Sequence, residues 1–138
     1  MRLEEKSIRG ATVINDAYNA NPESMSRAIE ELAQRKADRK IFVFADMLEL
    51  GDSSEALHRE IGTLAGRAGF DYYCATGTFA RSAVEAIVSA GIPCARVRLF
   101  ATAGELGRDL AGKLKSGDVV LIKASRAMAL DKVIDYLG

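Results

Sequence analysis

A polar segment, Asn15 to Ser24, places carboxylate, amide, hydroxyl and phenol groups directly before a predicted helix. Asn21 followed by Pro22 is typical of a helix start, because Asn caps exposed N–H groups and Pro tolerates the first helical position. The N–H groups and dipole at such a start favour a bound carboxylate or phosphate. The alternative is that the asparagines Asn15, Asn19 and Asn21 only form turns and the helix cap.

Two cations follow another apolar run. Lys123 directly follows Val119–Ile122, where an ammonium group without a partner would be costly, so we expect it to pair with Asp16 or with a substrate anion. Arg126 could hold a carboxylate through two parallel N–H bonds, or it is an ordinary surface arginine. The pair of cations therefore predicts either an anion site or a buried ion pair.

Asp46 ends a third apolar run, Ile41–Ala45. Such an aspartate could bind a metal, take a phosphoryl group, or accept bonds from neighbouring backbone N–H groups. His58 is the single histidine and stands in a predicted helix, where an exposed or packing role is favoured over a general base. Cys74 and Cys94 are not in a C-x-x-C motif, so a zinc site would lack ligands and no metal site is predicted. Both cysteines are expected to be reduced and packed.

The composition excludes several classes of protein. The 138 residues are 49% hydrophobic, which is typical of one folded domain. Nineteen basic and nineteen acidic residues give no net charge and form no basic block, which argues against nucleic acid as a partner. No apolar run approaches the ~20 residues of a membrane span and no signal region is present, so we expect a cytoplasmic location. Neither a Walker-type nor a dinucleotide-binding glycine motif occurs, so this domain is not expected to hold ATP alone.

Short β-rich runs alternate with longer stretches of helical spacing, so we predict an α/β fold with an open, mostly parallel sheet and helices on both faces. Ligands bind such sheets outside the carboxyl ends of the strands, which would bring the polar segments together. Asp52 with Glu55, and Thr102 with Glu105, predict capping boxes at two helix starts. The predicted strands are Ala11–Asn15, Ile41–Ala45, Tyr72–Ala75, Arg96–Phe100 and Val119–Lys123, with an N-terminal strand around Arg2–Ser7 that turns at Arg9 and Gly10.

Three strings carry a resemblance to a known family. They are N-D-A-Y-N-A-N-P-E-S-M from Asn15, D-M-L-E-L-G from Asp46 and K-A-S-R from Lys123. Together they resemble the C-terminal domain of the Mur ligase family, over essentially the whole chain. The resemblance implies a Rossmann-like fold, with residues 1–138 as a single domain and with the UDP-sugar and central ATP-binding domains absent from it.

Within the family, the strings are most similar to ligases of peptidoglycan synthesis that join D-alanyl-D-alanine to UDP-N-acetylmuramoyl-tripeptide. The resemblance implies an ATP-dependent amide ligase that works through an acyl phosphate, which the dipeptide amine attacks. This domain would bind the dipeptide and close over ATP, and the central domain would hold most of the ATP and Mg²⁺. The other two domains are then its partners, and the domain alone is expected to be inactive.

The same resemblance implies roles for particular residues of the three strings. It implies no catalytic residue in this domain alone and no metal ligand. Asp46 and Glu49 are expected to shape a loop that supports the site. Asp16 and Asn19 are expected near ATP, and the dipeptide is expected to contact Tyr18, Asn21, Lys123, Ser125 and Arg126.

Three alternatives remain open from the sequence. A receiver-like phospho-acceptor domain would use Asp16, Asp46, Thr76 and Lys123, although Asp46 then stands one strand–helix unit early. The chain could also be the C-terminal domain of a sibling Mur ligase or of a folylpolyglutamate ligase. A non-catalytic scaffold domain is the third alternative.

Overall fold

Short, nearly continuous apolar runs build a six-stranded sheet whose inner strands β3, β4 and β6 are buried on both faces. The computed structural model describes residues 4–17 and 20–138, and its strand order is β1-β2-β6-β3-β4-β5. β1 pairs antiparallel with β2, and all other pairs are parallel, which confirms the predicted mostly parallel sheet. The strands are β1 Glu4–Ile8, β2 Ala11–Asp16, β3 Arg39–Ala45, β4 Tyr72–Thr76, β5 Val97–Phe100 and β6 Asp118–Lys123.

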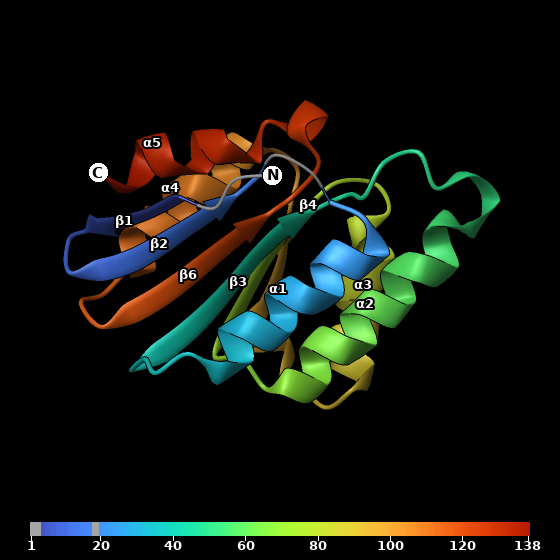
Figure 1. Ribbon diagram of the computed structural model, residues 1–138, viewed down its shortest axis with the longest axis horizontal. Coiled ribbons are helices and arrows are strands. Elements are labelled where there is room, and N and C mark those ends of the chain that lie inside the picture. The colour runs from blue at the N-terminus through green and yellow to red at the C-terminus, as the bar shows by residue number, and fades with distance from the viewer. Residues whose placement is uncertain (1–3, 18–19) are drawn as a thin grey trace.

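Helices cover both faces of the sheet, as Figure 1 shows. On one face, Phe42 and Phe44 of β3 pack with side chains of α1, α2 and α3; on the other, Ile41 and Val43 of the same strand pack with α4 and α5. The predicted fold class is therefore confirmed. The helices are α1 Pro22–Gln34, α2 Ser54–Ala68, α3 Ala80–Ser89, α4 Ala103–Lys113 and α5 Val133–Leu137, with short 3₁₀ turns η1 Gly51–Ser53, η2 Cys94–Arg96, η3 Arg126–Met128 and η4 Leu130–Lys132.

The helix caps follow the sequence only in part. The Thr102 side chain accepts a bond from the Glu105 N–H as predicted. The predicted box at Asp52 is wrong, because η1 precedes α2 and the N-cap residue Ser53 makes no side-chain cap bond. Tertiary structure supplies a different anchor for this segment, described below.

The cysteines also differ from the expectation. Cys74 is buried in β4, as predicted, but Cys94 is exposed, and both are unpaired thiols. Among residues 4–17 and 20–138, no cluster of three or more His, Cys, Asp or Glu side chains could hold a metal ion. Within the same described ranges, no helix is long and apolar enough to cross a membrane.

Candidate functional site

A buried ion pair marks the carboxyl edge of the sheet. β2 and β6 are neighbours in parallel register, so their last residues, Asp16 and Lys123, lie side by side. Lys123 Nζ donates to Asp16 Oδ2 at 2.7 Å, and the two side chains are 0% and 5% exposed. The sequence left two candidate partners for Lys123, Asp16 and a substrate anion. The structure confirms Asp16 as a partner.

The second oxygen of Asp16 has a different environment. Asp16 Oδ1 is buried and accepts no hydrogen bond from the described part of the chain. A buried acceptor normally has a donor, because burying it without one costs on the order of 1–3 kcal/mol. This oxygen is therefore suited to a hydroxyl or N–H group that a ligand would bring.

Asp16 also lines a cavity of about 200 Å³ between α1 and strands β2 and β6. The residues that line the cavity are mostly apolar near the sheet and charged along the helix: Ile14, Asp16, Ser24, Arg27, Ala28, Glu31, Leu32 and Leu121.

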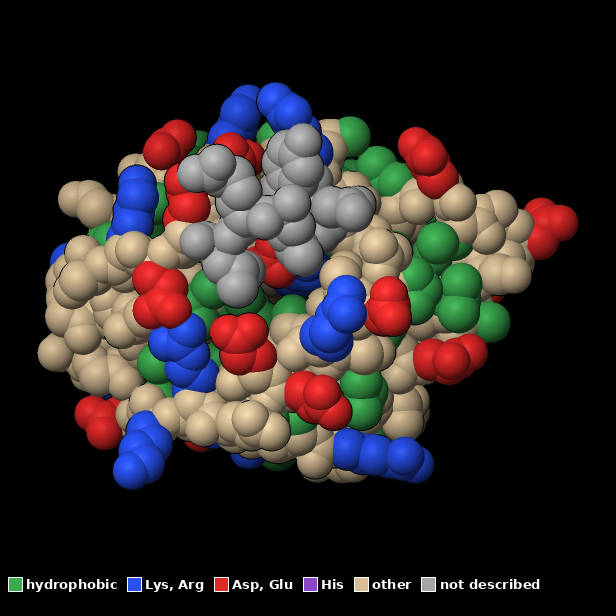
Figure 2. All heavy atoms as spheres, viewed as in Figure 1, with side chains coloured by type: hydrophobic (Ala, Val, Ile, Leu, Met, Phe, Trp, Pro, Cys, Tyr) green, Lys and Arg blue, Asp and Glu red, His purple; other side chains and the backbone are tan. Residues whose placement is uncertain are grey.

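The surface of this face carries charges of both signs. Figure 2, drawn from the same side as Figure 1, shows acidic and basic side chains interspersed, with no block of one sign.

The start of α1 is a complete capping box. Asn21 Oδ1 accepts from the Ser24 N–H at 2.9 Å, and Ser24 Oγ accepts from the Asn21 N–H at 3.1 Å. The Asn15 side chain forms a turn by accepting from the Ala17 N–H. The turn and cap roles predicted for Asn15 and Asn21 are thus present. Tyr18 and Asn19, expected at the dipeptide and at ATP, lie outside the described residues.

Asp46 caps a helix to which it is not adjacent in sequence. Its carboxylate accepts from three consecutive backbone N–H groups at the start of α3: Thr78 at 3.0 Å, Phe79 at 2.9 Å and Ala80 at 2.7 Å. A Cβ on Gly77 would lie 2.3 Å from Asp46 Oδ1, so only glycine allows this approach. The backbone-satisfying role weighed for Asp46 is present, and three N–H bonds account for its carboxylate without a metal or phosphoryl group.

The loop after β3 contacts the loop after β6. The Leu48 N–H donates to Ser125 Oγ at 3.3 Å, which joins the D-M-L-E-L-G segment to the K-A-S-R segment. Glu49 is exposed at the tip with a left-handed backbone, φ 62°, which suits the expected loop-shaping position. Arg126 follows Ser125 at the start of η3 and is exposed.

Sequence reasoning missed how this loop is held. The imidazole of His58, buried in α2, accepts from the Met47 N–H at 2.9 Å. The signal was present in the sequence, since a lone histidine on the apolar face of a helix needs a polar partner. Its partner could not be identified because Met47 belongs to a different element.

The structure thus brings four predicted residues, Asp16, Asp46, Lys123 and Ser125, to the carboxyl edge of the sheet. Asp16 and Lys123 form an ion pair, and Ser125, two residues beyond Lys123, contacts the loop that begins at Asp46. The edge combines one buried carboxylate oxygen, a hydroxyl and an exposed arginine. Such a set can bind a small ligand that carries both donors and a carboxylate.

Comparison with known proteins gives a family match over most of the chain. The description "Mur ligase, glutamate ligase domain" matches residues 1–126. The UDP-N-acetylmuramoyl-tripeptide--D-alanyl-D-alanine ligase of Bacillus subtilis (strain 168) is 34% identical over 139 residues, which cover 99% of this chain and 30% of that protein. The enzyme of the same name from Rickettsia prowazekii (strain Madrid E) is 32% identical over 130 residues, 94% of this chain and 28% of that protein.

Solved structures agree with the sequence match. A crystal structure of MurF from Acinetobacter baumannii has a TM-score of 0.85 and 31% identity, over 99% of this chain and 30% of that one. MurF ligase from Thermotoga maritima, in complex with ADP, has a TM-score of 0.77 and 30% identity, over 96% and 29% of the two chains. The chain therefore spans roughly three-tenths of the length of these relatives.

Proposed function

Because this chain belongs to the Mur ligase family, we propose that it is the C-terminal domain of an ATP-dependent ligase that joins D-alanyl-D-alanine to UDP-N-acetylmuramoyl-tripeptide. Its part in the reaction is to bind the dipeptide and present the amine to an activated acyl group held by other domains. Binding one reactant on each of two domains makes the step effectively unimolecular and lets closure exclude water. The relatives named above carry this activity in their names.

One observation carries the proposal. The three strings that resemble the dipeptide-adding ligases meet at one edge of the sheet, through the Asp16–Lys123 ion pair and the Leu48–Ser125 bond. These contacts join loops that are more than seventy residues apart in sequence. An edge assembled from distant loops is the position at which open α/β sheets bind ligands.

The dipeptide carboxylate is assigned to the segment after β6. Arg126 supplies a planar set of donors and Ser125 a hydroxyl, and a carboxylate is held best by charged and neutral donors together. Lys123 adds positive potential from below, although its ammonium is already bonded to Asp16. Tyr18 and Asn21 remain candidate dipeptide contacts, with the Asn21 amide oxygen already engaged in the helix cap.

ATP and Mg²⁺ are assigned mainly to the central domain of the full ligase. The residues here fit a limited contact with the nucleotide, because Asp16 Oδ1 is a buried acceptor with no donor from the described residues. A ribose hydroxyl is a suitable donor for that oxygen, and Asn19 is the second candidate at the nucleotide. A cytoplasmic location is part of the same proposal.

The test is an amide NMR titration of this chain with D-alanyl-D-alanine to millimolar concentration, with L-alanyl-L-alanine as the stereochemical control. Arg126→Ala removes the assigned carboxylate contact, and Arg67→Ala is the matched control, because Arg67 is an exposed arginine on α2. We expect shifts confined to residues 15–24 and 123–128 that favour the D,D isomer. We expect them to weaken at least tenfold in Arg126→Ala and to persist in Arg67→Ala.

Equal shifts with both isomers, or shifts that survive Arg126→Ala, would overturn the assignment of the dipeptide to this edge. The same pair of variants in the complete ligase gives the second readout. There, Arg126→Ala should raise the KM for the dipeptide and leave the KM for ATP unchanged. A change in the KM for ATP alone would instead assign Arg126 to nucleotide binding.

A further inference from the structure

His58 lies where three segments meet: α2, the start of α3 and the loop after β3. It stands in the second turn of α2, is 1% exposed, and its ring lies 5.7 Å from the ring of Phe79, the N-cap residue of α3. The loop after β3 passes on its other side. A buried imidazole in this position has to be satisfied by groups from its neighbours.

The hydrogen bonds assign the tautomer of this ring. Nε2 accepts from the Met47 N–H at 2.9 Å, and Nδ1 lies 2.6 Å from the Ser54 carbonyl oxygen. A carbonyl oxygen cannot donate, so Nδ1 carries the proton and Nε2 is the bare acceptor. The ring therefore uses both nitrogens to join the start of α2 to the loop after β3.

Three consecutive residues of that loop are each anchored to a different element. Asp46 accepts from the start of α3, the Met47 N–H donates to His58 in α2, and the Leu48 N–H donates to Ser125 after β6. The middle anchor determines the path of the backbone between the other two. Moving Met47 would therefore move the Leu48 N–H away from Ser125.

The contact to Ser125 has a chemical consequence. A serine hydroxyl has one O–H donor and two acceptor lone pairs. Because Ser125 Oγ uses a lone pair to accept from the Leu48 N–H, its own hydrogen is left for donation to another acceptor. A carboxylate is such an acceptor, and Ser125 belongs to the segment assigned above to the carboxylate of the dipeptide.

We propose that His58 is a positioning residue, which holds the Met47–Leu48 backbone so that Ser125 offers its hydroxyl to the carboxylate of the dipeptide. The part that concerns the dipeptide rests on the proposed function. The part that concerns the backbone stands on the hydrogen bonds alone. His58 acts through Met47, Leu48 and Ser125 and does not touch the ligand.

The experiment uses two substitutions of His58 and one control on the same helix. His58→Leu removes the acceptor for the Met47 N–H, whereas His58→Gln keeps an amide oxygen at the same distance along the side chain. Thr63→Ala is the control, because the Thr63 hydroxyl donates to the Arg59 carbonyl within α2. The readouts are imidazole ¹⁵N shifts of the unsubstituted chain, amide shifts and hydrogen exchange at Met47 and Leu48, and the Kd for D-alanyl-D-alanine.

We expect the Nδ1–H tautomer in the unsubstituted chain. His58→Leu should speed exchange of the Met47 amide at least tenfold, shift the Leu48 and Ser125 signals, and raise the Kd about tenfold. His58→Gln should restore most of each property, and Thr63→Ala should change none. A protonated Nε2, unchanged Leu48 and Ser125 signals in His58→Leu, or a His58→Gln variant as defective as His58→Leu would each overturn the proposal.

The experiment distinguishes failure of the His58 proposal from failure of the proposed function. If His58→Leu does not fold, the ring tautomer and the His58→Gln variant still decide the matter, since they leave the packing volume in place. If the unsubstituted chain shows no preference for the D,D dipeptide, the proposed function fails. The coupling of His58 to Leu48 and Ser125 is still read from their signals without any ligand.

Discussion

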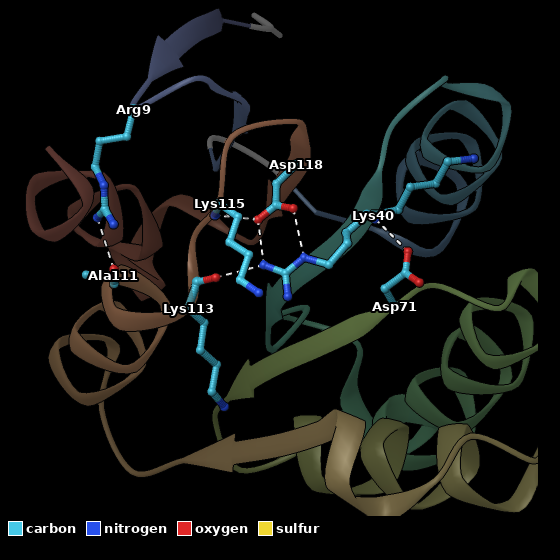
Figure 3. A network of polar contacts seen from close by, with 8 residues as sticks. Arg9, Lys40, Asp71, Ala111, Lys113, Lys115 and Asp118 are labelled. Carbon is cyan, nitrogen blue, oxygen red and sulfur yellow. Dashed lines mark hydrogen bonds and ion pairs between the residues drawn. The ribbon is translucent and has the colours of Figure 1, made fainter.

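Two buried aspartates, one at the end of β2 and one at the start of its neighbour β6, have very different hydrogen bonding. At the amino ends, Asp118 of β6 accepts from Arg39 Nε at 2.8 Å, from Arg39 Nη2 at 2.7 Å and from the Lys115 N–H at 2.8 Å, so both oxygens are satisfied. Figure 3 shows these bonds converging on Asp118. At the carboxyl ends, Asp16 has one bonded oxygen and one with no donor from the described residues.

This difference indicates that the Asp118 carboxylate has a structural role, whereas the Asp16 carboxylate is a candidate for ligand binding. The bidentate bond to Asp118 raises the pKa of Arg39, as expected for a guanidinium held by a carboxylate. Arg39 also donates to the Lys113 carbonyl, so this network joins β3 to the end of α4. A carboxylate that the chain satisfies completely has no capacity left for a ligand, whereas Asp16 retains an acceptor.

The largest expected effect comes from breaking the complete network. Asp118→Ala would leave the Arg39 guanidinium and the Lys115 N–H without their partner. Removing one member of a largely buried ion pair costs on the order of 3 kcal/mol of unfolding free energy. Urea unfolding measures this loss, and Asp135→Ala, an exposed aspartate on α5, should change stability by less than about 0.5 kcal/mol. Equal losses in both variants would remove the structural role of Asp118.

Asp16→Asn should cost the fold nearly as much and should be more severe for function. The amide keeps an oxygen for Lys123 but loses the charge that compensates a fully buried ammonium, which predicts a loss of about 2–3 kcal/mol in the same urea measurement. In the complete ligase we expect ATP-dependent ligation to fall at least tenfold, because the acceptor for the nucleotide is weakened. A stability loss as large as that of Asp118→Ala, with unchanged ligation, would make the two aspartates equivalent.

Asn21 tests whether a cap and a binding contact coincide at the carboxyl edge. Asn21→Ala removes the acceptor for the Ser24 N–H and should cost about 1 kcal/mol, whereas Asn21→Asp keeps the cap and should leave thermal stability nearly unchanged. A dipeptide contact through the amide N–H₂ would still be lost in Asn21→Asp. If Asn21→Asp bound the dipeptide with unchanged affinity, Asn21 would act only as a helix cap and not as a dipeptide contact.

The smallest effect is expected from an exposed pair that joins the sheet edge to α1. The hydrogen bond from Arg35 lowers the pKa of Glu5 below 4.5, so the native state binds fewer protons there than the unfolded chain. The pair therefore stabilises the fold above pH 4.5, and this contribution is lost as pH falls through the lowered pKa.

Solvent screening limits this contribution to about 0.3 kcal/mol. Arg35→Ala should accordingly lower thermal stability slightly at pH 7 and in low salt. The difference from the unsubstituted chain should shrink as the pH falls below the lowered pKa of Glu5, and it should also shrink in 1 M salt. A difference that persists under both conditions would show that Arg35 contributes through packing.

Much of the fold could be predicted from local patterns. Short β-rich apolar runs identified five of the six strands, and an N-terminal strand was expected around Arg2–Ser7, close to the observed β1. The Asn21 and Thr102 caps identified the starts of α1 and α4. Local patterns failed at α2, where Asp52 and Glu55 suggested a box. There the chain is held by the His58–Met47 bond, which joins two elements.

The candidate site was predictable as a set of residues but not as a geometry. The sequence by itself determined that polar groups follow apolar strands, that Lys123 needs an anionic partner, and that three strings resemble one ligase family, because these properties are carried by neighbouring residues. Only the tertiary structure decided that Asp16 is this partner, that Asp46 caps α3, and that Leu48 contacts Ser125. Each of these contacts depends on strand order and register, which arise when the whole sheet buries its two faces and not from any single segment.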